Sequence, residues 1–204
     1  LGDVYKRQPY SYQVNVSNRD VSQDPVSRYE HGLPKKGFVF CCFNNNYKIT
    51  ISVFSIWMRI LLAVEDSVLW LLENESITKK NLIQEAEKFG INKDRLVFAK
   101  MVPVEDHLSR IRLADLFIDT LPYNAHTTAS DALRMGVPVL TCIGESFASR
   151  VAASLLSALK LHSLITNSHS EYESLAIELA TQPKKLKAVK DLLSISLSSE
   201  TLYN

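Results

Sequence analysis

Short, almost continuously apolar runs alternate with helix-like segments along most of this chain, and this rhythm limits the possible folds more than any other feature. Residues 38–43 and 67–72 are two such runs, with the sequences Phe-Val-Phe-Cys-Cys-Phe and Ser-Val-Leu-Trp-Leu-Leu. Strands without polar alternation are typical of parallel sheets that helices cover on both faces. The other predicted strands are residues 96–99, 116–119 and 138–141. We therefore expect an α/β fold with a doubly wound, mostly parallel, Rossmann-like sheet, followed by C-terminal helices.

The segments between these runs have the periodicity of helices. Residues 78–89 carry Leu82, Ala86 and Phe89 on one face, and Gly90 follows as a stop signal. The remaining predicted helices are residues 50–64, 105–113, 128–135, 147–159, 171–180 and 184–193.

Composition divides the 204 residues into three parts. Residues 1–36 are polar and are expected to be an extended or loosely ordered lead-in, of which residues 1–8 show no periodicity and could be foreign to the fold. Residues 37–195 carry the alternating pattern and form the predicted lobe. Residues 196–204 look like a truncated tail, because the last helical region has no evident stop signal. This end, and the start at Leu1, suggest a fragment of a longer protein.

Charge and cysteine content exclude several classes of partner. The formal net charge is +1, so no strong field draws the chain to nucleic acid or to an anionic membrane. The most apolar helix, residues 51–64, contains Arg59 and is too short to span a bilayer. The three cysteines lack metal-ligand spacing, and the adjacent Cys41 and Cys42 are expected to be small core residues. Their odd number, together with the lack of a signal peptide, predicts a protein of the reducing cytoplasm. Because their spacing is not that of metal ligands, we expect no metal site.

Polar loops follow four of the predicted strands, at what would be one edge of the sheet. In doubly wound sheets ligands bind outside the carboxyl ends of the strands, so these loops are expected to form the functional site. The chain has neither a Gly-x-Gly-x-x-Gly fingerprint nor a P-loop, so any nucleotide contacts must be of another kind. The loops cover residues 43–48, 103–110, 120–128 and 144–146.

The loop that ends in His126-Thr127-Thr128 is the most informative of these. It leads from an apolar strand into a helix, and the free backbone N–H groups of a helix N-terminus attract phosphate. Thr128 and Asp131 also have the spacing of a Thr-x-x-Asp helix cap, so the loop could equally be a capped helix start without a ligand. Asp131 could at the same time accept hydrogen bonds from ribose hydroxyls.

Two further groups of side chains suggest a nucleotide. Lys48 stands just before a helix, where a cation is unfavourable unless an anion joins it, so we expect it to contact phosphate. The alternative is a loop that only needed its turn-forming asparagines. His107 and Arg110 share a helix face and suit contacts to a nucleobase. They could equally belong to a solvated surface on which Glu105 or Asp106 pairs with Arg110.

Together these motifs resemble the C-terminal catalytic half of the O-linked N-acetylglucosamine transferase and SPINDLY family, glycosyltransferase family 41. The resemblance runs from about Tyr10 to the end of the chain and implies one lobe of a two-lobed GT-B fold behind tetratricopeptide repeats. The Pro-Tyr-Asn form of the loop after the fourth predicted strand is similar to the bacterial branch. The matching segments are Gly32-Leu33-Pro34, Cys42-Phe43-Asn44, Tyr47-Lys48-Ile49, residues 67–72, Glu105-Asp106-His107, residues 113–115, 119–128, 136–141, 144–145 and 148–154.

The resemblance implies a set of residues that contact a nucleotide-sugar donor. Lys48 matches a lysine that contacts the diphosphate and is the expected catalytic residue, while Asp131 matches the ribose contact. Val104 stands where animal enzymes carry a lysine near the nucleobase, which leaves the base and the sugar open. A UDP-sugar is favoured, and a GDP-sugar is the alternative because the SPINDLY branch is associated with fucose transfer. The full set is Asn45 in place of a glutamine, Lys48, Val102 and Val104, the base-contacting pair His107 and Arg110, the diphosphate loop His126, Thr127 and Thr128, and Asp131.

By this resemblance the chain is the donor-binding lobe of a protein O-glycosyltransferase. It would transfer N-acetylglucosamine from UDP-N-acetylglucosamine to Ser or Thr hydroxyls with inversion, without a metal cofactor. Its expected partners are an N-terminal catalytic lobe and the tetratricopeptide repeats, without which it should catalyse little. The alternatives are an O-fucosyltransferase lobe that uses GDP-fucose, and a non-catalytic nucleotide-binding or scaffolding module. A flavodoxin-like domain is disfavoured, because the phosphate loop follows the fourth strand rather than the first.

Overall fold

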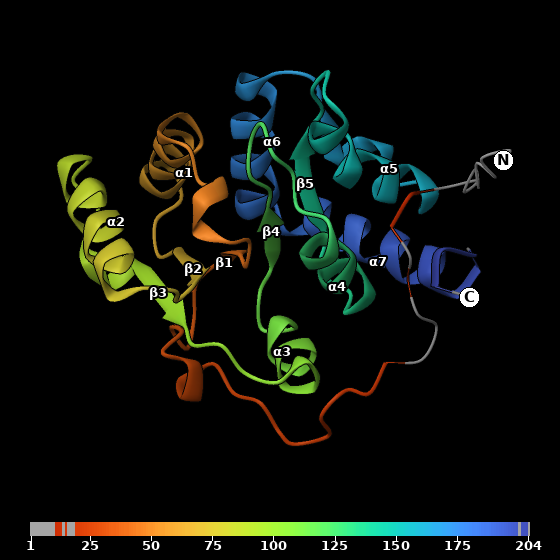
Figure 1. The fold of residues 1–204 in the computed structure, drawn as a ribbon, viewed down its shortest axis with the longest axis horizontal. Coiled ribbons are helices and arrows are strands. Elements are labelled where there is room, and N and C mark those ends of the chain that lie inside the picture. Colours follow the sequence, from red (N-terminus) through yellow and green to blue (C-terminus); the bar gives the residue numbers. More distant parts are fainter. Residues whose placement is uncertain (1–10, 14, 16–18, 200, 204) are drawn as a thin grey trace, which may run out of the picture.

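A sheet of six parallel strands forms the centre of the computed structural model, which describes residues 11–13, 15, 19–199 and 201–203 (Figure 1). The strand order β3-β2-β1-β4-β5-β6 is that of a doubly wound sheet, as expected. The first five strands match the predicted runs to within one residue. The sixth was not predicted, because two residues are too few to make a pattern. The strands are β1 (Val39–Cys42), β2 (Val68–Leu72), β3 (Leu96–Ala99), β4 (Leu116–Ile118), β5 (Val139–Cys142) and β6 (Ile165–Thr166).

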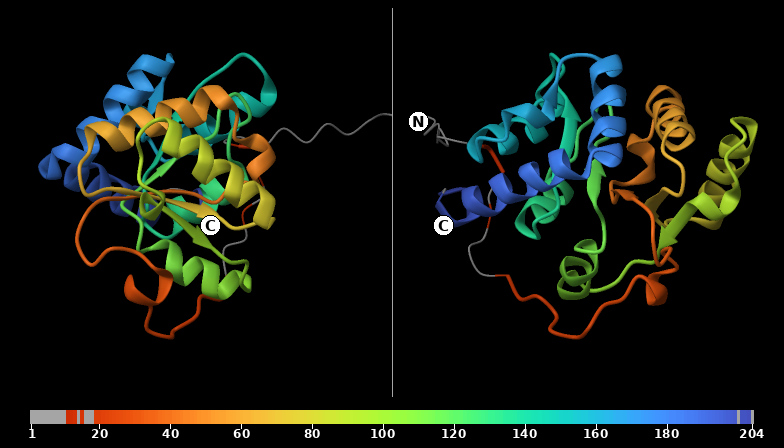
Figure 2. Two further views of the ribbon diagram at one scale, coloured as in Figure 1. Left: turned by 90° about the vertical axis from the view of Figure 1, so that its left-hand side faces the viewer. Right: turned by 180° about the vertical axis from the view of Figure 1, so that it is seen from behind.

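Helices cover both faces of this sheet (Figure 2). Right-handed crossovers place the helices that follow β1 and β2 on one face and those that follow β3, β4 and β5 on the other. The helix after β6 packs against α1, and α4 contacts both α3 and α5. The helices are α1 (Ile51–Ala63), α2 (Ser76–Lys88), α3 (Val104–Ile111), α4 (Thr127–Arg134), α5 (Val151–Ala158), α6 (His169–Thr181) and α7 (Pro183–Ser199).

Two helical predictions differ from the structure. The segment expected as one helix over residues 147–159 is a 3-10 turn, Phe147–Ser149, followed by α5. Arg150 between them has φ −122°, outside the helical range, so the chain bends there. At the other end α7 continues through Ser199, past the boundary expected at residue 195. Residues 1–8, expected to be foreign to the fold, lie outside the described part.

The core is built from the strands and the helix faces turned toward them. Cys41 and Cys42 on β1 are fully buried, as expected for small core residues, and Cys142 on β5 is buried as well. Tyr172 on α6 links this core to the end of β4. Its hydroxyl accepts a hydrogen bond from Nε1 of Trp57 at 3.1 Å and donates one to the carbonyl of Asp119 at 2.9 Å. The last residue of the predicted β4 run is thereby fixed from the interior.

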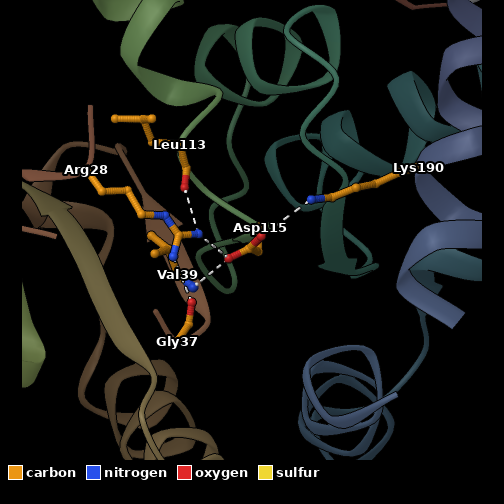
Figure 3. A network of polar contacts seen from close by, with 6 residues as sticks. All are labelled: Arg28, Gly37, Val39, Leu113, Asp115 and Lys190. Atoms are coloured by element: carbon orange, nitrogen blue, oxygen red, sulfur yellow. Dashed lines mark hydrogen bonds and ion pairs between the residues drawn. The ribbon is translucent and has the colours of Figure 1, made fainter. Parts of the chain in front are cut away.

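The lead-in is anchored at the amino ends of β1 and β4 (Figure 3). Arg28 donates hydrogen bonds to Oδ2 of Asp115 and to the carbonyl of Gly37, both at 2.9 Å. The same carboxylate oxygen accepts from the amide of Val39 at 2.9 Å, and Nζ of Lys190 on α7 lies 3.5 Å from the other oxygen. From this anchor the described lead-in runs past α3 toward α4, drawn in red in Figure 1.

No helix in the part of the chain that the structure describes combines the length and the apolar character needed to cross a membrane.

Candidate functional site

The loops after β1 and β4 meet where the strand order reverses. The chain fills the sheet on one side of β1 with β2 and β3 and then returns to its other side with β4. Such a switch point leaves a crevice outside the carboxyl ends of the two central strands. Lys48 follows β1 and the His126 loop follows β4, so the topology brings together the two parts that were expected to meet.

Lys48 lies against the loop after β4. Its ammonium Nζ donates a hydrogen bond to the carbonyl of Asn124 at 3.0 Å and is 3.8 Å from the centre of the Tyr123 ring. Burial lowers the pKa of Lys48, and the nearby carboxylate of Asp119 acts against this shift. The side chain thus places a half-buried cation against Asn124, a residue that precedes His126 by two positions.

His126 is held as a neutral imidazole beside this cation. Burial lowers its pKa, and the charge of Lys48 lowers it further. Its Nδ1 lies 2.5 Å from the hydroxyl of Tyr12 in the lead-in. Its Nε2 is buried and has no hydrogen-bond partner among the described residues. A buried ring nitrogen of this kind can bond to a ligand that enters the loop.

The N-terminus of α4 is not closed by a side-chain cap. Its N-cap residue is His126, whose side chain accepts no hydrogen bond from the amides of the first turn. The expected Thr-x-x-Asp cap is therefore wrong, because α4 begins at Thr127, which makes Thr128 its second helical residue rather than its cap. The hydroxyl of Thr128 donates to Oδ1 of Asn44, and Asp131 pairs with Arg19 at 2.7 Å. The amides of the first turn remain a favourable place for an anion.

Asp119 and Asn44 hold the loop after β4 in place by hydrogen bonds. Neither residue was predicted from the sequence to have a role in the site. Asp119 is completely buried, and its Oδ1 accepts hydrogen bonds from the amides of Ala125 at 2.6 Å and Thr120 at 2.8 Å. Burial raises the pKa of Asp119 to about 7, against the effect of these hydrogen bonds. Asn44 joins the loop to β1, because its Nδ2 donates to Oγ1 of Thr120 at 2.6 Å. A carboxylate at the end of an all-apolar strand could have signalled this role.

A pocket of about 480 Å³ lies beside this loop, between the carboxyl ends of the strands and α3. Seven of the ten expected donor-contacting residues line it, whereas Asn45, Lys48 and His126 do not. Asn45 is exposed, and its Oδ1 accepts a hydrogen bond from Nδ2 of Asn74 at 3.2 Å. The residues lining the pocket are Arg19, Asp20, Phe43, Leu72, Met101, Val102, Val104, Glu105, His107, Arg110, Thr127, Thr128 and Asp131.

His107 and Arg110 form the inner wall of the pocket. Only 3% of Arg110 is exposed, and its Nη1 donates to the carbonyl of Lys100 at 2.7 Å. His107 lies edge-on to Phe43, with 5.0 Å between the ring centres. Burial and the charge of Arg110 lower the pKa of His107 to about 4, so its imidazole is neutral at pH 7. The alternative of a solvated helix surface is wrong, because both side chains are turned inward and held there.

As far as the described residues go, no three His, Cys, Asp or Glu side chains are grouped so as to hold a metal ion.

Comparison with known proteins shows what the chain is similar to. The model of glycosyl transferase family 41 matches residues 12–204. A probable UDP-N-acetylglucosamine–peptide N-acetylglucosaminyltransferase, SEC of Arabidopsis thaliana, is 38% identical over 203 residues, which cover 96% of this chain and 21% of that protein. The UDP-N-acetylglucosamine–peptide N-acetylglucosaminyltransferase of Caenorhabditis elegans is 36% identical over 179 residues, covering 88% and 16%. The chain thus spans about a fifth of the length of these relatives.

Solved structures of glycosyltransferases are similar to this chain as well. A mutant of the O-GlcNAc transferase of Thermobaculum terrenum superposes with a TM-score of 0.78 at 29% identity, covering 94% of this chain and 35% of that one. WaaG, a glycosyltransferase involved in lipopolysaccharide biosynthesis, superposes with a TM-score of 0.67 at 16% identity, covering 86% and 46%, and shares the fold alone. The resemblance read from the sequence is confirmed.

Proposed function

Because the chain belongs to glycosyltransferase family 41, we propose that it is the lobe that binds the nucleotide-sugar donor of a protein O-glycosyltransferase. The observation that carries the proposal is that seven of the expected residues line one and the same pocket. They are Val102, Val104, His107, Arg110, Thr127, Thr128 and Asp131. These residues come from α3, from the loop that precedes it and from α4, and a shared pocket is what a common ligand requires.

In this proposal the donor lies across the pocket with its base toward α3. The neutral imidazole of His107 and the guanidinium of Arg110 face the base, and Asp131 accepts hydrogen bonds from the ribose hydroxyls. The diphosphate lies at the N-terminus of α4, within reach of Lys48. Val102 and Val104, which are 37% and 52% exposed, cover the open side of the base.

The reaction proposed is transfer of N-acetylglucosamine from UDP-N-acetylglucosamine to a Ser or Thr hydroxyl with inversion at the anomeric carbon. The acceptor oxygen forms the new bond to the anomeric carbon and gives up its proton to a base outside this lobe. The bond between that carbon and the diphosphate breaks at the same time, and its electron pair stays on the phosphate oxygens. Lys48 and the amides of Thr127 and Thr128 are arranged to stabilise that charge, a contribution of about 3–4 kcal/mol per donor in comparable sites. A lysine and a helix N-terminus supply the positive charge that a metal supplies elsewhere, so we propose that no metal takes part.

The proposal extends to the rest of the protein. An N-terminal catalytic lobe would complete the acceptor side of the site, and tetratricopeptide repeats would bind the acceptor protein. The names of the Arabidopsis and Caenorhabditis relatives support a nucleotide-sugar donor and a peptide acceptor. The three buried free cysteines are compatible with work in the reducing cytoplasm.

Lys48 provides the first test. We expect Lys48→Ala to weaken UDP binding by about 10- to 100-fold, because it removes a charged hydrogen-bond donor of about 1.5–3 kcal/mol. Isothermal calorimetry with UDP measures this. Lys79→Ala is a matched control, since Lys79 also lies over an aromatic ring, with Nζ 5.1 Å from the centre of Phe98, but it belongs to α2 and pairs with Glu73 instead of the loop after β4. Equal affinities for wild type and Lys48→Ala would remove Lys48 from the site.

A GDP-sugar is the second candidate donor, because apolar Val104 stands at the base end of the pocket where a lysine would favour one base over another. A screen of UDP- and GDP-sugars, read by the mass gained by an acceptor peptide, decides between the two. Turnover of GDP-fucose without turnover of UDP-N-acetylglucosamine would replace the leading proposal.

A further inference from the structure

Arg19, in the lead-in, lies at the donor pocket although nothing in the sequence pointed to it. Its Nη1 is 2.7 Å from Oδ1 of Asp131, and the two side chains are only 29% and 10% exposed. Both Arg19 and its neighbour Asp20 line the pocket. A segment expected to be a linker therefore supplies part of the wall.

The lead-in is fixed on both sides of Arg19. Before it, the hydroxyl of Tyr12 lies 2.5 Å from Nδ1 of His126, and Nε2 of Gln13 donates to Oγ1 of Thr127 at 3.4 Å. After it, the amide of Ser22 donates to the carbonyl of Glu105 at 3.2 Å. The contacts join the lead-in to α4 at one end of the pocket and to α3 at the other. Described residues on both sides of Arg19 thus contact the lobe, and Arg19 itself is held by its ion pair.

The charges around the pocket show why a further cation is needed there. Three carboxylates line it, those of Asp20, Glu105 and Asp131. The other guanidinium in its wall, that of Arg110, is 3% exposed and donates inward to the carbonyl of Lys100. A nucleoside diphosphate, itself an anion, would be repelled by this set of charges. Arg19 neutralises Asp131, the one of these three carboxylates that belongs to α4 itself.

The guanidinium also has donors to spare. Arginine carries five N–H donors in a fixed plane, and the ion pair with Asp131 fixes that plane in the pocket while using one terminal nitrogen. A side chain held in this way loses little freedom when it binds a ligand.

We propose that Arg19 is a donor-binding residue, which pairs with Asp131 and bonds to the anionic part of the nucleotide. The inference rests on the proposed function, because it concerns the same pocket. It adds to the site a charge from outside the sheet, so that the donor contacts the lead-in as well as the lobe.

The test compares UDP with uridine, which lacks the phosphates. We expect Arg19→Ala to weaken UDP binding by about 10-fold or more, the effect of one charge-assisted hydrogen bond, and to change uridine binding by less than about 3-fold. Arg19→Lys should recover part of the loss, since it keeps the charge but not the planar fork. Lys35→Ala is the control, because it removes one positive charge from an exposed position in the same segment, outside the pocket. Calorimetry for UDP and competition for uridine give the affinities, and thermal unfolding verifies that each variant is folded.

Two outcomes would overturn the inference. If wild type binds UDP and Arg19→Ala binds it equally well, Arg19 has no part in the site. If Arg19→Ala binds UDP more tightly, the lead-in competes with the donor instead of holding it. A wild-type protein that binds neither UDP nor GDP overturns the proposed function itself, and the assignment of Arg19 falls with it.

Discussion

At the scale of single residues, the site depends on a few buried polar groups that hold one another in place. Asp119 fixes two amides of its loop and faces Lys48, while Asn44 joins the same loop to β1. Removing one partner from such a set leaves the others buried without hydrogen bonds, which costs more than the bond itself contributed. These residues shape the loop without any need to touch a ligand.

Asp119 gives a prediction about pH. Its pKa is raised to about 7 in the folded chain from 3.8, so its favourable contribution to stability is fully present below about pH 4 and is lost as pH rises through about 7. Asp119→Asn cannot titrate and should therefore gain stability relative to wild type as pH rises over this range. Urea unfolding of both proteins at pH 5 and pH 8 gives the difference. A difference that does not change with pH would mean that Asp119 is ionised throughout.

At the scale of elements, the key junction is the one between the loop after β1 and the start of α4. The hydroxyl of Thr128 donates to Oδ1 of Asn44, so the second residue of the helix is tied to the neighbouring strand. This bond sets the direction in which the first-turn amides point.

Thr128→Val tests this junction, because valine has the same shape without the hydroxyl. We expect a loss of about 1 kcal/mol in the free energy of unfolding, typical of one hydrogen bond, together with a several-fold weaker affinity for UDP. Thr181→Val is a matched control, since its hydroxyl donates to the carbonyl of Ile177 in an exposed turn of α6. Denaturation and calorimetry on the two variants separate the effects; unchanged UDP affinity in Thr128→Val would show that the helix start needs no help from β1.

Elements were far easier to predict from the sequence than the contacts between them. Five strands were evident as apolar runs. The rule that ligands bind at the carboxyl edge of the sheet was enough to predict that Lys48 lies near the loop after β4, and it does. Asn44 and Arg19 were missed because their roles depend on partners 75 to 112 positions away in the sequence, and Asp119 was missed because its role depends on its complete burial. Spacing within one element carries no information about such partners. The helix cap at Thr128 was predicted wrongly for the same reason, because its hydroxyl donates to Asn44, a residue far away in the sequence.

At the scale of the whole molecule, Arg28 and Asp115 connect the lead-in to the lobe. Their ion pair of 2.9 Å is part of a network that also reaches Gly37, Val39 and Lys190 (Figure 3). The network lies at the amino ends of the strands, and the donor pocket lies at their carboxyl ends. The lead-in is therefore held at two opposite edges of the sheet.

A double-mutant cycle on Arg28→Ala and Asp115→Ala measures this anchor. We expect a coupling of about 1–2 kcal/mol, above the usual value of less than 1 kcal/mol for an exposed pair, because several bonds share these two side chains. The exposed pair Lys187 and Asp191, at 2.5 Å, is the control and should give about 0.3–0.5 kcal/mol. Equal couplings in the two cycles would contradict a special role for Arg28.

The buried cysteines have a practical consequence for labelling the lead-in with a fluorescent dye. Cys41, Cys42 and Cys142 are all shielded from solvent, and burial raises the pKa of Cys41 and Cys42, which keeps these two as unreactive thiols. A cysteine introduced at an exposed position such as Gln23 would then react with a maleimide dye ahead of the native ones. Fluorescence from that dye during a nucleotide titration would report directly on whether the segment tightens around its ligand.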